Sequence, residues 1–134
     1  MLKKAYLSME DSAKKPPTET WHYHFIAKIS EYRLRQVWTA KFADKPFPNV
    51  TALILSDQEF LRTIQLQRTS SSLIKDMSEK EYGRPSKPEN ITAQVHKSGE
   101  GYVIIMRQHS IFTLDQILEH ELRHIYKRET EIPP

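Results

Sequence analysis

The chain has 134 residues, 38% of them hydrophobic and 28% charged, which is the size of one domain with enough apolar residues for a core. It has 0 cysteines and only 3 glycines, which excludes disulfide frameworks, zinc–thiolate and iron–sulfur sites, thiol nucleophiles and glycine-rich phosphate loops. The net charge of +3 permits a nucleic-acid partner without requiring one, and neither a membrane-spanning run nor a signal peptide is apparent, so we expect an intracellular, cytoplasmic protein.

The first part of the chain predicts a flexible lead-in followed by strands. Residues 1–19 show no sustained periodicity and are expected to be a flexible N-terminal segment, with residues 20–134 forming a single α+β domain. Alternation of apolar and polar residues over 21–29 and again over 32–42 predicts two strands of an antiparallel hairpin. The apolar run 49–55 predicts a third, more buried strand.

The second part predicts two helices around a second hairpin. Ser56 and Glu59 have the spacing of a capping box and predict a helix start, although the sequence leaves open whether that helix continues as far as Met77. Segments 91–96 and 102–107 predict a β-hairpin. A second capping box at 113–116 opens the last helix. The predicted fold class is therefore α+β, with a small, mostly antiparallel sheet, one backing helix and a C-terminal helix.

The last helix carries the motif with chemical content, His120-Glu121-Leu122-Arg123-His124. Residues four apart lie on one face of a helix, so the imidazoles of His120 and His124 can reach one metal ion. The glutamate between them can act as general base on water activated by that metal. Zinc suits such a site because its bound water ionises near neutral pH.

The helical projection gives Glu121 an unusual position. At 100° per residue it falls inside a continuous apolar stripe, while His120 and His124 lie along the edge of that stripe. The stripe is formed by Leu114, Ile117, Leu118, Leu122 and Ile125. A carboxylate among core residues is costly unless it has a partner or a chemical task, so this placement favours a metal site.

The HExxH helix, preceded by a buried strand and an earlier packing helix, resembles the N-terminal half of zincin metallopeptidases over about residues 50 to 128. That resemblance implies a zincin-like fold and a zinc-dependent hydrolase of peptide or protein substrates. It implies that His120 and His124 are zinc ligands and that Glu121 activates the water attacking an amide carbonyl.

The third zinc ligand stays open. His109 precedes the last helix and is one candidate, and the pair His22 and His24, which share one face of the predicted first strand, is another. A second copy of the chain is a further source, and the sequence also allows that the chain is part of a larger protein. As ordinary side chains, His96 and His109 are expected at surface or turn positions.

Two other function classes are compatible with the sequence. The predicted first hairpin presents a basic face, which suits a non-catalytic nucleic-acid or protein-binding module. Its members are Lys28, Arg33, Arg35 and Lys41. The motif also resembles the HxxR box of tyrosine recombinases, where arginine and histidine stabilise a phosphate. Tyr126 would then have to be the nucleophile.

Overall fold

The computed structural model describes residues 23–67, 72–78 and 87–131, so the predicted N-terminal segment lies outside the described residues. The elements, in chain order, are β1 (Ala27–Lys28), α1 (Glu31–Phe42), β2 (Val50–Leu55), α2 (Asp57–Gln67), β3 (Leu73–Ser78), the 3-10 turn η2 (Pro88–Asn90), β4 (Ile91–Ser98), β5 (Gly101–Arg107) and α3 (Leu114–Glu131). In the part of the chain described, no helix is long and apolar enough to cross a membrane.

The strands form one sheet in the order β1-β2-β5-β4-β3. Only β2 and β5 run parallel, and every other neighbouring pair is antiparallel. The predicted hairpin of β4 and β5 is confirmed, and it turns through Gly99, whose φ of 59° suits glycine. The α+β class and the mostly antiparallel sheet predicted from the sequence are thus confirmed.

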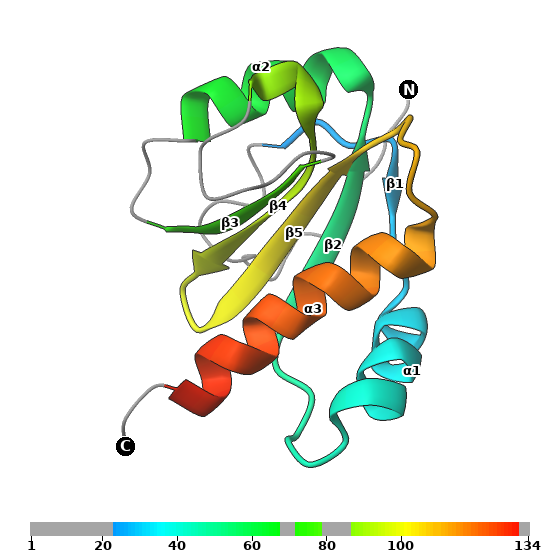
Figure 1. The fold of residues 1–134 in the computed structure, drawn as a ribbon, viewed down its shortest axis with the longest axis vertical. Helices are drawn as coiled ribbons and strands as arrows, with labels where there is room; N and C mark the ends of the chain where they lie inside the picture. The colour runs from blue at the N-terminus through cyan, green and yellow to red at the C-terminus, as the bar shows by residue number, and fades with distance from the viewer. Residues whose placement is uncertain (1–22, 68–71, 79–86, 132–134) are drawn as a thin grey trace, which may run out of the picture.

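Helices cover both faces of this sheet (Figure 1). On one face α3 crosses the strands and α1 lies beside it, and their buried side chains share a core cluster with alternate residues of β2, β4 and β5. On the other face Phe60 and Ile64 of α2 pack on Leu53 and Ile105, which point the opposite way along the same strands. The HExxH helix therefore lies on the α1 face, with α2 on the far side of the sheet.

The predicted strand over 32–42 is wrong, because this segment is helix α1. Ser30 caps the helix by accepting a hydrogen bond from the Arg33 backbone nitrogen at 3.1 Å. Leu34, Trp38 and Phe42 are buried at four-residue intervals, which is the helical period. Since Leu34 and Trp38 are an even number of residues apart, they also satisfied the two-residue period of a strand.

The first hairpin and its basic face are consequently absent from the described residues. Of the predicted strand 21–29, only Ala27–Lys28 pairs in the sheet, while Trp21 and His22 lie outside the described residues. The four basic residues divide between β1 and α1, and three of them form ion pairs. These pairs are Arg33 with Asp115, Arg35 with Glu31, and Lys41 with Glu119.

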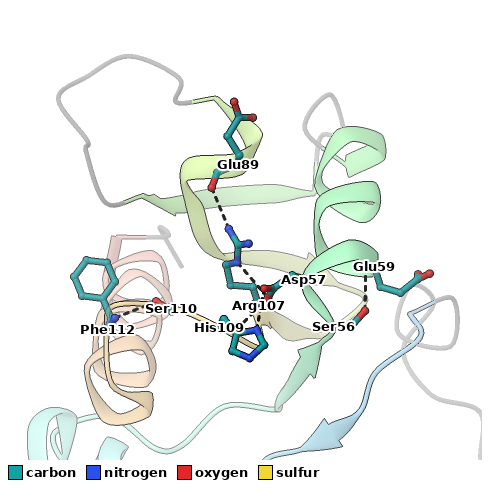
Figure 2. A network of polar contacts seen from close by, with 8 residues as sticks. All are labelled: Ser56, Asp57, Glu59, Glu89, Arg107, His109, Ser110 and Phe112. Carbon is teal, nitrogen blue, oxygen red and sulfur yellow. Dashed lines mark hydrogen bonds and ion pairs between the residues drawn. The ribbon is translucent and has the colours of Figure 1, made fainter.

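The two predicted caps position α2 and α3. Ser56 accepts a hydrogen bond from the Glu59 backbone nitrogen at 3.2 Å (Figure 2). The Glu59 carboxylate pairs with Arg62 instead of completing the box. At α3 the box is reciprocal, because Thr113 Oγ1 accepts from the Gln116 nitrogen at 3.2 Å and Gln116 Oε1 accepts from the Thr113 nitrogen at 2.8 Å. The open question after α2 is resolved by strand β3, which ends the possibility of one helix through Met77.

Candidate metal centre

Helix α3 has three sides with different surroundings. One side faces α1, where Asp115 pairs with Arg33 and Tyr126 donates a hydrogen bond to Asp44 at 2.8 Å. A second side is the buried stripe over the sheet. By the helical period, His120 and His124 lie on the flank of the stripe opposite to α1, and the effect of Lys75 on His124 places this flank near β3. The histidines are therefore half-buried at the edge of the helix–sheet interface.

The two imidazoles converge on one point. His120 Nε2 and His124 Nε2 are 3.1 Å apart, with ring centroids separated by 4.8 Å and planes tilted by 72°. Two nitrogen ligands of one tetrahedral zinc ion, each about 2.0–2.1 Å from the metal, lie roughly 3.3 Å apart. The pair therefore has the spacing of a two-histidine chelate. Without a metal, the same distance corresponds to one Nε2–H donating to the other nitrogen.

The surroundings of His124 favour the neutral form of its imidazole. The pKa of His124 is lowered to about 4, mainly by burial and to a smaller extent by the neighbouring His120. The positive charges of Lys75, Lys127 and Arg123 act in the same direction. Metal ligation requires the unprotonated imidazole, so a lowered pKa removes the competition between protons and metal near neutral pH.

Glu121, which lies between the two histidines in the sequence, is on the buried stripe of α3. It is 0% exposed, and neither of its carboxyl oxygens has a hydrogen-bond partner within the described residues. Burial raises its pKa well above the usual value, the negative charge of Asp76 raises it further, and Lys75 opposes the rise. The burial predicted from the helical projection is confirmed. These surroundings favour the neutral carboxylic acid over the carboxylate.

The contribution of β3 was not foreseen from the sequence. Lys75 and Asp76 affect the pKa of Glu121 only because β3 pairs with β4 beneath α3. The register of β3 shifts twice, between Leu73 and Lys75 and between Met77 and Ser78. These irregularities break the alternation of apolar and polar residues, so the segment carries no clear strand signal.

The proposed third ligands do not join the pair within the described residues. Among those residues, no group of three or more histidine, cysteine, aspartate or glutamate side chains is arranged to hold a metal. His24 is exposed, and His22 lies outside the described residues. The structure therefore offers two ligands, and the third remains unassigned.

His109 occupies a separate polar network at the start of α2 (Figure 2). Asp57 accepts hydrogen bonds from the backbone nitrogen of His109 at 3.0 Å and from its Nδ1 at 2.9 Å. Arg107 contacts the same carboxylate and donates to the carbonyl oxygen of Glu89 at 3.0 Å. These contacts lower the pKa of Asp57 despite the opposing effect of burial. The His109 side chain is 77% exposed, as expected for a surface residue.

His96 is not the surface or turn residue predicted from the sequence, because it is 0% exposed. His96 lies on the same face of β4 as Gln94 and Ser98. Because β4 is covered on both faces, this polar face is buried and not exposed to solvent. The predicted strand over 91–96 was the signal that could have placed His96 in the core, because a central strand is buried on both of its faces.

Arg123 and Tyr126, which the recombinase interpretation requires, make their contacts on the α1 side of α3. Arg123 pairs with Glu119 at 2.8 Å and lies 5.5 Å from the centre of the Phe42 ring. Tyr126 stacks on Phe42 on the same α1 side. In the recombinase interpretation, Arg123 and Tyr126 would have to act at one phosphate with the histidines, whereas here both pack toward α1.

Comparison of the chain with protein-family models, with curated proteins and with solved structures found no match.

Proposed function

We propose that the chain is a zinc-dependent, metallopeptidase-like hydrolase in which His120 and His124 hold the metal. The observation that carries this proposal is the 3.1 Å separation of the two Nε2 atoms on the helix that also buries Glu121, whose carboxyl oxygens have no hydrogen-bond partner among the described residues. A structural role for Glu121 would call for a hydrogen-bond partner, and in the part of the chain that the structure describes neither oxygen has one.

The donor set fits zinc in kind. Neutral imidazoles are preferred zinc ligands, and a dication near Glu121 would favour the ionised carboxylate that burial otherwise opposes. When bound, zinc supplies Lewis acidity and makes water a nucleophile near neutral pH. A complete site needs at least one further ligand from outside the described cluster.

Glu121 is the residue that would move protons. As a carboxylate it accepts a proton from the attacking water, and as a carboxylic acid it returns that proton to the departing amine. Burial raises the pKa of Glu121 above its usual value, and a more basic carboxylate accepts a proton more readily. The buried stripe around it keeps bulk water from competing for the proton.

A peptide-library assay tests the proposal. The zinc-supplemented protein should cleave a mixture of quenched fluorescent peptides, and Glu121→Gln should reduce the rate by about 100-fold or more while retaining zinc. Glu131→Gln, an exposed substitution at the end of the same helix, is the matched control and should leave the rate unchanged. Equal rates in wild type and Glu121→Gln would refute the assignment of the base.

A further inference from the structure

A second cluster of reactive side chains lies on the opposite face of the sheet from the metal centre. Ala93 and Val95 of β4 point to the α1 and α3 face, so the alternating residues Gln94 and His96 point to the other face. Both are 0% exposed. Asp76 of β3 pairs in register with Gln94, and Ser72 directly precedes β3.

Three hydrogen bonds join these side chains into a chain. Gln94 Nε2 donates to Asp76 Oδ1 at 2.7 Å. His96 Nε2 lies 3.0 Å from Gln94 Oε1, and Ser72 Oγ lies 3.3 Å from His96 Nδ1. The sequence order is Ser72, Asp76, Gln94 and His96, so only the pairing of β3 with β4 brings them together.

The direction of every hydrogen bond follows from Asp76. A carboxylate only accepts, so the Gln94 amide nitrogen must face it and the amide oxygen must face His96. His96 Nε2 therefore carries the proton. In the neutral tautomer with Nε2 protonated, Nδ1 is the acceptor for the Ser72 hydroxyl. This is the order of a nucleophile, a base and an orienting group.

We propose that Ser72 is a nucleophile activated by His96 and directed at acyl esters, forming a site independent of the metal centre. Ser72 Oγ attacks the ester carbonyl carbon while its proton passes to His96 Nδ1. The tetrahedral intermediate expels the alcohol, which takes that proton, and leaves an acyl-serine. Water then attacks the acyl-serine, gives a proton to His96 and releases the acid as the proton returns to Ser72.

Gln94 and Asp76 are positioning residues in this scheme. They fix the tautomer of His96 and stabilise the imidazolium that forms when the serine proton is transferred. Ser72 is itself half-buried, so a substrate carbonyl can approach the hydroxyl while the base stays shielded from water.

The absence of cysteine from the chain allows a direct test. Ser72→Cys introduces a single thiol, and a neighbouring imidazole lowers the pKa of a thiol by stabilising the thiolate. Alkylation by iodoacetamide should therefore reach half of its maximal rate at least one pH unit lower in Ser72→Cys than in Ser72→Cys combined with His96→Gln. Identical pH profiles, or no alkylation of the folded single-thiol protein, would overturn the proposal.

Labelling of the wild-type protein by diisopropyl fluorophosphate gives a second readout that needs no substitution at His96. Mass spectrometry should locate the adduct at Ser72, and a chelator should leave its rate unchanged because the metal centre lies on the other face. Adducts spread over several serines, or none at Ser72, would contradict a nucleophile there. Failure of either test leaves the metal-centre proposal standing, and loss of zinc binding leaves this one standing.

Discussion

Replacement of Glu121 by glutamine should change how stability depends on pH. In the unfolded chain this carboxyl ionises at about pH 4.3. In the folded protein, burial raises its pKa well above that value. Between the two values the folded state holds a proton that the unfolded state has lost. The free energy of unfolding therefore falls as pH rises, with a slope of at most about 1.4 kcal/mol per pH unit.

The difference between wild type and Glu121→Gln isolates this effect. Glutamine does not titrate, so the wild type should lose stability relative to the variant from about pH 4.3 up to the raised folded pKa. His124 acts in the opposite direction. Its pKa is lowered to about 4, so its contribution rises with pH up to its usual value of 6.5. Because both proteins contain His124, that contribution cancels in the difference.

Urea unfolding from pH 4 to 8, in the presence of a chelator, measures the difference directly. The exposed control Glu131→Gln should follow the wild-type curve at every pH. Added zinc should flatten the wild-type slope, because a nearby dication favours the carboxylate. A difference in unfolding free energy between wild type and Glu121→Gln that does not vary with pH would refute the burial of Glu121 without a hydrogen-bond partner among the described residues.

Three further predictions concern other parts of the fold. Gly101→Ala should destabilise the protein by about 1–3 kcal/mol in urea unfolding, because its Cβ would lie 2.7 Å from the Asn49 carbonyl oxygen; unchanged stability would contradict that close approach. Trp38→Ala should lower the free energy of unfolding by about 3–5 kcal/mol in the same assay, because this side chain is 2% exposed in the main core. A loss below about 1 kcal/mol would refute the packing of α1. His109→Ala should leave zinc affinity unchanged in calorimetry, because Asp57 holds His109 at the start of α2, and a clear loss of affinity would make it a ligand.

The sequence predicted the elements whose signals are local. The capping residues Ser56 and Thr113 located the starts of α2 and α3, and the helical projection placed Glu121 in the core. Local signals failed for α1, because Leu34 and Trp38 fit a strand as well as a helix. The cap at Ser30 and the third buried position at Phe42 distinguish the two.

The surroundings of the site could not be predicted because they depend on pairing between distant strands. Lys75 and Asp76 act on Glu121 only through the register of β3 on β4, and that register is interrupted by two shifts. The hydrogen-bonded chain through His96 arises from the same pairing. The motif on α3 was visible in the sequence because its spacing is set within one helix.

Zinc content of the tag-free protein tests the central claim most directly. After incubation with zinc and removal of excess, elemental analysis should find close to one zinc per chain in wild type and almost none in His120→Ala or His124→Ala. Circular dichroism should show that both variants keep the wild-type helix content, since the two side chains lie at the edge of the core. Wild type without zinc, or folded variants that retain it, would contradict a metal centre on α3.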